Sequence, residues 1–122
     1  MRHTSGPRKW GLPKTSNNKC RWFVERRLEF NGAWHMDRQQ HTIFARNIGK
    51  LYIVYSYGEH YPMFLFRKGW WYENSDGYSR STGRHHSNAR PYYNGEAELK
   101  REIKPLTTED MKNIIRREKY GI

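Results

Sequence analysis

Residues 51–66 constrain the fold more than any other part of the chain. Two short runs, 51–57 and 61–66, are rich in β-branched and aromatic residues; Gly58 lies between them, and Arg67, Lys68 and Gly69 follow the second. Runs of this length and composition favour β-strands over helix. We therefore predict a β-hairpin with one strand over each run.

Both faces of the first predicted strand carry apolar side chains. Successive residues of a strand point to opposite faces, so residues 51, 53, 55 and 57 share one face and residues 52, 54 and 56 the other. This predicts either a central strand covered on both sides or a strand whose second face is a tyrosine-lined binding surface. Pro62 cannot donate to a strand ladder, which places the start of the second strand at a sheet edge or beside a β-bulge.

A third strand is predicted to begin at residues 70–72, before the turn sequence 74–77. Residues 107–110 combine an N-cap hydroxyl with acids in a first helical turn, and Met111, Ile114 and Ile115 form an apolar stripe. We predict one α+β domain over residues 21–122, with a mostly antiparallel sheet of about four to six strands and the C-terminal helix packed on it. We expect residues 1–20 to form a basic, flexible arm.

Three segments are less determined by their patterns. Residues 21–30 fit a strand or a short helix, and the turn pair Asn31-Gly32 favours a strand that enters a hairpin returning over residues 33–36. Residues 42–45 predict a further short strand that ends by residues 47–49. Residues 91–104 fit either helix or strand, and Pro105 is expected to end that element.

Charge indicates the class of partner. Lys and Arg outnumber Asp and Glu by 23 to 12, which gives a formal net charge of +11. An excess of this size favours a nucleic acid, a nucleoprotein complex or an acidic protein as partner, although a small protein can also be basic without binding any of them.

A single cysteine excludes an internal disulfide and favours a reducing compartment. The sequence contains neither an apolar run long enough to span a bilayer nor a signal peptide, so we expect no membrane association.

Three segments carry the cations that we expect to contact phosphate. The arm contains Arg8 and Lys9 beside Trp10, a ring that either stacks on a base or folds back onto the domain. Residues 78–90, predicted as a polar loop, supply arginines, hydroxyls and histidines, unless the loop is packed on itself. The C-terminal helix presents a basic row. The predicted phosphate or nucleic-acid ligands are Arg8, Lys9, Trp10, Arg80, Ser81, Thr82, Arg84, His85, His86, Arg90, Lys112, Arg116 and Lys119.

Part of the chain resembles an uncharacterised domain of bacteriophage and other viral proteins. The matching positions are Tyr55, Ser56, Tyr57, Gly58, His60 and Pro62, then Asn74, Asp76, Tyr78 and Ser79, then Thr82, His85 and Ser87; Ser81 replaces a usual threonine. The resemblance covers about a third of the chain and implies no activity. It implies a viral origin, action in the host cytoplasm, and a role such as inhibiting a bacterial defence or transcription system.

Two other classes of function remain open from the sequence. His60 with His85 or His86 could form an acid–base pair, with Arg84 or Arg80 stabilising the transition state of a metal-free nuclease. Alternatively, the loop captures a small phosphorylated nucleotide.

A zinc site drawn from Cys20 and the histidines lacks compact ligand spacing, and no nucleotide-binding or nucleophile motif is present, so no cofactor is expected.

Overall fold

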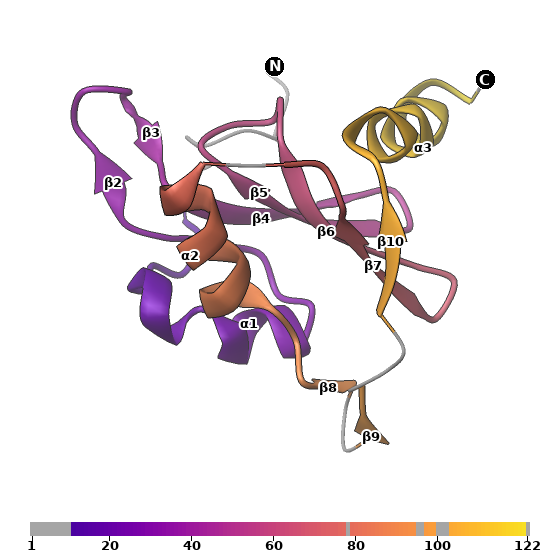
Figure 1. Cartoon of the computed structure of the whole chain (residues 1–122), viewed down its shortest axis with the longest axis horizontal. Helices are drawn as coiled ribbons and strands as arrows, with labels where there is room; N and C mark the ends of the chain where they lie inside the picture. The colour runs from indigo at the N-terminus through magenta and orange to yellow at the C-terminus, as the bar shows by residue number, and fades with distance from the viewer. Residues whose placement is uncertain (1–10, 78, 95–96, 100–102, 122) are drawn as a thin grey trace.

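The computed structural model describes residues 11–77, 79–94, 97–99 and 103–121. Its main element is a six-stranded sheet in the order β1-β4-β5-β6-β7-β10 (Figure 1). Each neighbouring pair is antiparallel except β10, which pairs parallel with β7. The sheet strands are β1 (Phe30–Asn31), β4 (Ile43–Ile48), β5 (Leu51–Ser56), β6 (Pro62–Arg67), β7 (Trp70–Asn74) and β10 (Ile103–Leu106).

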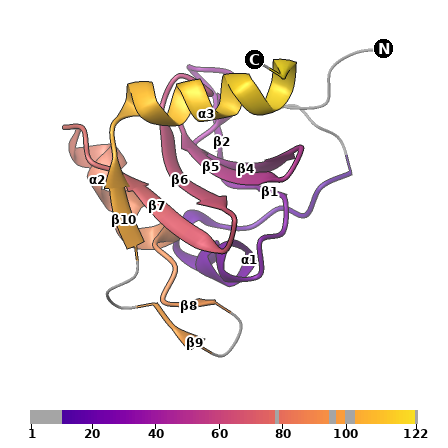
Figure 2. The same ribbon diagram turned by 90° about the vertical axis from the view of Figure 1, so that its right-hand side faces the viewer.

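Helices cover both faces of this sheet. The helix α3 (Thr108–Tyr120) lies on one face, whereas α1 (Arg21–Glu25), α2 (Arg80–Ala89) and the short 3-10 helix η1 (Asn17–Lys19) lie on the other (Figure 2). Two small hairpins, β2 (Trp34–His35) with β3 (Gln40–His41) and β8 (Tyr93–Asn94) with β9 (Ala97–Glu98), extend from the body. Within the described part of the chain, no helix is long and apolar enough to cross a membrane. The predicted α+β class, with a mostly antiparallel sheet and a C-terminal helix, is confirmed.

The central hairpin forms because β5 contributes to two hydrophobic clusters. Tyr52 and Val54 belong to the cluster beneath α1 and α2, whereas Ile53 and Tyr55 pack beneath α3 with Met111. All six residues of β5 are buried, so it is a central strand covered on both sides. Pro62 pairs opposite Tyr55, next to a shift in register, as its missing N–H predicted.

The predicted boundaries of α3 are also confirmed. The side chain of Thr107 accepts a hydrogen bond from the Asp110 N–H at 3.1 Å, which satisfies one of the free amides of the first turn. Met111 and Ile115 are buried against the sheet and Ile114 is partly buried. Gly121 ends the helix in the left-handed conformation with φ of 72°.

Several local predictions are wrong. Residues 21–25 form the helix α1, and β1 pairs with β4 instead of forming a hairpin with residues 33–36. Residues 80–89, predicted as a loop, form α2. Pro105 lies inside β10, which is an edge strand and therefore tolerates a residue without an N–H.

The expected arm divides into two parts in this structure. Residues 1–10 lie outside the described residues. In the part that follows, the Thr15 N–H donates to the Asn31 carbonyl at 3.0 Å, the Asn31 N–H donates to the Pro13 carbonyl at 2.9 Å, and Cys20 is fully buried. Residues 13–20 therefore lie against the domain beside β1.

Gly32 follows β1 because the chain passes too close to β4 for a side chain. Its N–H donates to the Ile43 carbonyl, and a Cβ on Gly32 would lie 2.5 Å from that oxygen and 2.8 Å from Asn17 Oδ1. We expect Gly32→Ala to lower the free energy of unfolding by about 2 kcal/mol, since the crowded atom is backbone. Urea denaturation measures this loss. Gly77→Ala is the matched control, because among the described residues no atom apart from its chain neighbours lies within 4 Å of its added Cβ. An equal loss in both variants would contradict the steric explanation.

Candidate nucleic-acid interface

The basic row of α3 lines a hollow beside the turn between β5 and β6. Lys112, Arg116 and Lys119 border this space of about 230 Å³ together with His60 of the turn. Its remaining lining residues are Tyr55, Glu59, Ile115 and Tyr120. The structure therefore brings three of the predicted helix residues together with one of the predicted histidines.

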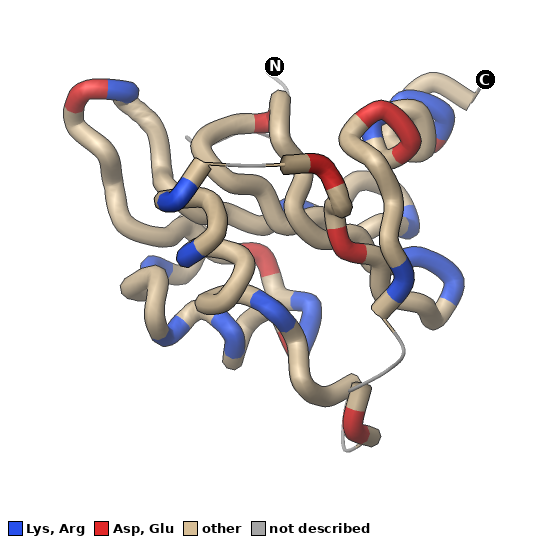
Figure 3. The backbone as a smooth tube through the Cα atoms, viewed as in Figure 1, with Lys and Arg blue, Asp and Glu red and all other residues tan. Residues whose placement is uncertain are grey.

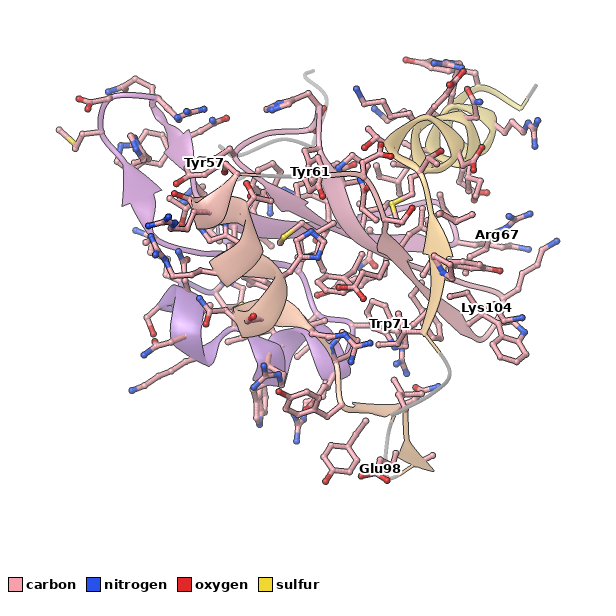
Figure 4. All side chains as sticks on the ribbon, in the orientation of Figure 1. Tyr57, Tyr61, Arg67, Trp71, Glu98 and Lys104 are labelled. Atoms are coloured by element: carbon pink, nitrogen blue, oxygen red, sulfur yellow. The ribbon has the colours of Figure 1, made fainter. Side chains whose placement is uncertain are left out.

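A second basic hollow borders the same helix. It has a volume of about 160 Å³, and its cations are Lys50 from the β4–β5 turn, Arg67 and Lys68 from the end of β6, and Arg117 from α3. Arg67 extends outward at the end of the sheet away from Tyr57 and Tyr61 (Figure 4). Leu51, Ile114 and Glu118 complete the lining.

We call the basic residues around these two hollows, on the two sides of α3, the α3 basic surface. Its members are Lys50, His60, Arg67, Lys68, Lys112, Arg116, Arg117 and Lys119. Seven Lys and Arg residues line the two hollows against the two carboxylates of Glu59 and Glu118, and Figure 3 shows the Lys and Arg positions along the helix. Glu118 accepts a hydrogen bond from the Lys50 N–H at 2.7 Å. Such a surplus of cations attracts a polyanion.

The sequence predicted only part of this surface. Lys50 comes from a turn, and Arg67 and Lys68 come from the end of β6 and the turn after it; all three lie far before the helix in the sequence, and no local pattern joins them to it. The available signal was that cations flank the apolar hairpin strands on both sides. Once the helix is placed on that hairpin, those flanking cations must lie near its ends.

Because the predicted polar loop is in fact the helix α2, only some of its side chains are exposed. Arg80 and Arg84 are exposed and lie one turn apart, so both remain available to a ligand. Thr82, His85 and His86 are buried. Ser81 is half-buried. The prediction that these residues form one phosphate-binding loop is therefore wrong for the buried members, because their side chains face the sheet.

His85 holds α2 onto β5. Its Nδ1 lies 2.7 Å from Ser56 Oγ, its ring packs 4.9 Å from the Tyr57 ring, and Ser56 Oγ lies 3.3 Å from Thr82 Oγ1. Burial lowers the pKa of His85 to about 4, and the charges of Arg84 and His86 act in the same direction. The imidazole is therefore neutral at physiological pH.

His86 belongs to a second polar network under α2. Its Nε2 lies 3.1 Å from the Tyr61 hydroxyl and its Nδ1 lies 3.0 Å from Glu73 Oε2. Arg90 donates to the other carboxylate oxygen of Glu73 at 3.3 Å. Burial acts to raise the pKa of Glu73, but the hydrogen bonds and charges of His86 and Arg90 outweigh it and the pKa is lowered. Arg90 thus has a structural partner.

The geometry does not support the histidine pair of a nuclease. His60 borders the hollow beside Tyr55 and α3, whereas His85 contacts Ser56, whose side chain points to the opposite face of β5. His85 and His86 are both buried and hydrogen-bonded beneath α2, so neither is placed as an accessible partner for His60. Among the described residues, no group of three or more His, Cys, Asp or Glu side chains could hold a metal ion. Arg8, Lys9, Trp10 and Tyr78 lie outside the described residues.

Several of the residues that carried the viral resemblance have structural roles. Ser56, Thr82 and His85 dock α2, and the Ser79 side chain caps that helix by accepting from the Thr82 N–H at 3.2 Å. Asn74 donates to the Pro62 carbonyl and to Thr108 Oγ1, each at 2.8 Å, and Asp76 accepts from the Thr108 N–H at 2.8 Å. Hydrogen bonds from the side chain and then the backbone of Thr108 lower the pKa of Asp76. These positions therefore attach α2 to the sheet and fix the first residue of α3.

Comparison of the chain with protein-family models, with curated proteins and with solved structures finds no match in any of the three.

Proposed function

We propose that this chain binds nucleic acid and that the α3 basic surface holds the phosphate backbone. The observation that carries the proposal is the placement of seven Lys and Arg residues around two hollows on the two sides of one helix. Cations spaced along a helix suit the regular spacing of phosphates, and each phosphate that is neutralised releases a bound counterion. Burial of Met111 and Ile115 fixes the helix on the sheet, so these cations project from a rigid element.

The expected partner is free nucleic acid or a host nucleoprotein complex. A viral origin and inhibition of a bacterial defence or transcription system remain predictions, and they rest on the sequence resemblance. Capture of a small phosphorylated nucleotide is the second candidate, because the larger hollow has a volume of about 230 Å³ and three helix cations on its border. The nuclease hypothesis has no geometric support, since both candidate partners of His60, His85 and His86, are buried and hydrogen-bonded beneath α2.

The first test compares two variants that remove the same charge from different places. Arg116→Gln with Lys119→Gln removes two exposed cations of the α3 basic surface, and Arg38→Gln with Lys104→Gln removes one exposed Arg and one exposed Lys elsewhere. We expect the first variant to bind duplex DNA about tenfold more weakly at low salt, with a salt slope shallower by about 1.8 for two lost phosphate contacts. Titration of labelled duplex DNA over a range of salt concentrations measures both quantities.

The control variant should retain most of the affinity. Equal losses in the two variants would mean that net charge alone attracts the DNA, and no loss in the first would remove α3 from the interface. Labelled single-stranded RNA, single-stranded DNA and a mononucleotide belong in the same experiment. Stoichiometric binding of the mononucleotide without binding of any polymer would favour the second candidate function.

A further inference from the structure

A second exposed surface, on the other side of the sheet, combines aromatic rings with arginines. Trp22 of α1 is 51% exposed, and Tyr92, which precedes β8, is 47% exposed. The guanidinium carbon of Arg26 lies 4.1 Å from the centre of the Trp22 ring, and that of Arg21 lies 4.0 Å from the centre of the Tyr92 ring. We call these four residues the arginine–aromatic platform.

Hydrogen bonds hold the residues of the platform in place, and Arg26 itself donates to the Trp22 carbonyl at 3.0 Å. Arg21 donates through Nε to the Arg90 carbonyl at 2.7 Å and through a second nitrogen to the Ser87 carbonyl. The Tyr92 N–H donates to the Glu25 carboxylate at 2.8 Å, which fastens the β8 segment to α1. Val24 and Cys20 anchor α1 in the core. The rings are therefore placed before any ligand arrives, so little side-chain entropy is lost on binding.

The local chemistry matches a nucleotide with an unstacked base. Aromatic rings and guanidinium planes both stack on the face of a base, and a guanidinium that lies over a ring can also contact the adjoining phosphate. In a duplex the base faces are covered by their neighbours, so only a single strand offers them. The one carboxylate described among these contacts, that of Glu25, accepts the Tyr92 N–H, and the platform itself contributes two positive charges.

The platform is separate from the α3 basic surface. α3 covers one face of the sheet, whereas α1 and β8 lie on the other side (Figure 2). The two surfaces also differ in chemistry, because the α3 surface has lysines and arginines around hollows, whereas the platform stacks guanidinium groups on partly exposed aromatic rings. We propose that the arginine–aromatic platform is a second site, which binds unpaired bases of single-stranded nucleic acid by stacking. This inference deepens the proposed function and rests on it for the class of partner.

The test is Trp22→Ala combined with Tyr92→Ala. We expect the double variant to bind a labelled single-stranded oligonucleotide at least about tenfold more weakly at physiological salt, while its affinity for a duplex of equal length changes less than about twofold. Trp22→Phe combined with Tyr92→Phe keeps both ring faces and should restore most of the single-strand affinity. Because both side chains are exposed, the fold should survive, and circular dichroism checks this.

Trp70→Ala is the matched control. Trp70 is 45% exposed and also pairs with a cation, since Lys104 Nζ lies 4.2 Å from its ring centre, but it belongs to β7 outside the platform. Equal weakening by Trp70→Ala, or unchanged single-strand binding by the double variant, would overturn the platform while leaving the proposed function intact. Failure of the unaltered protein to bind any nucleic acid would instead overturn the proposed function, and the platform proposal with it.

Discussion

Replacing Arg46 by alanine should destabilise the protein by about 3 to 5 kcal/mol. Arg46 lies in β4 and is fully buried. One guanidinium nitrogen donates to the Phe30 carbonyl at 3.0 Å and to the Ala45 carbonyl at 2.9 Å, and the other donates to Asn31 Oδ1 at 2.7 Å. Removing the side chain would leave these acceptors in the core without their charged donor and would open a cavity among the rings beneath α3.

The loss should be large because the guanidinium also attaches an edge strand. Strand β1 has only two residues, and two of the three acceptors belong to it. Burial lowers the pKa of Arg46 to about 10, partly opposed by the charges of Glu29 and Glu59, so the group stays charged at neutral pH. Its removal should therefore loosen β1 and the adjoining residues 13–15.

Urea denaturation followed by tryptophan fluorescence measures the loss in Arg46→Ala. Arg38→Ala is the control, because Arg38 is exposed in the β2–β3 hairpin and should change the free energy of unfolding by less than about 1 kcal/mol. Arg46→Lys should fall between the two, since an ammonium cannot reproduce the planar fork of donors. A loss below about 1 kcal/mol in Arg46→Ala would mean that the buried acceptors find water or new partners.

The parts of the fold that were predictable are those in which local pattern and burial agree. The hairpin of β5 and β6 is apolar on both faces and is covered on both faces. In α3, the Thr107 cap, the stripe of Met111 and Ile115 and the terminal Gly121 all indicate the same helix. Each of these signals lies within a few residues of the element that it defines.

Helix α2 was missed because its buried side chains are polar. Thr82, His85, His86 and Ala89 follow helical spacing, but only Ala89 is apolar, so a search for hydrophobic periodicity does not find them. The Ser79 cap was the usable signal. The turn pair Asn31-Gly32 led to the wrong prediction of a hairpin. Gly32 is required by the closeness of the Ile43 carbonyl, and this contact between residues far apart in sequence leaves no local pattern.

The candidate sites, too, were predictable only where their residues lie close together in the sequence. The row Lys112, Arg116 and Lys119 was visible because it repeats along one helix. Its neighbours Lys50 and Arg67, and the pairing of Arg21 with Tyr92, depend on tertiary contacts between distant segments. Charge composition thus indicated the kind of partner, and only the fold divided the cations between two surfaces of different chemistry.

Stability should fall steeply in acid because of His85. In the unfolded chain this histidine binds a proton near pH 6.5, whereas in the folded protein burial lowers its pKa to about 4. Between these values the unfolded state binds more protons than the folded state, so lowering the pH favours unfolding. We expect the free energy of unfolding to decrease by about 3 kcal/mol from this group between pH 7 and pH 4.

Comparison with His85→Asn isolates this contribution. An asparagine amide can replace Nδ1 in the contact with Ser56 but does not titrate in this range, so the variant should lose much less stability between pH 7 and pH 4. The pKa of Glu73 is also lowered, so its protonation in acid destabilises the folded state. This loss of stability occurs in both proteins and cancels when they are compared. Urea titrations at pH 7, 5 and 4 measure this difference. If the two proteins lose equal stability, the proton must bind elsewhere; a smaller loss in the variant would show that the contact that docks α2 on β5 depends on a neutral imidazole.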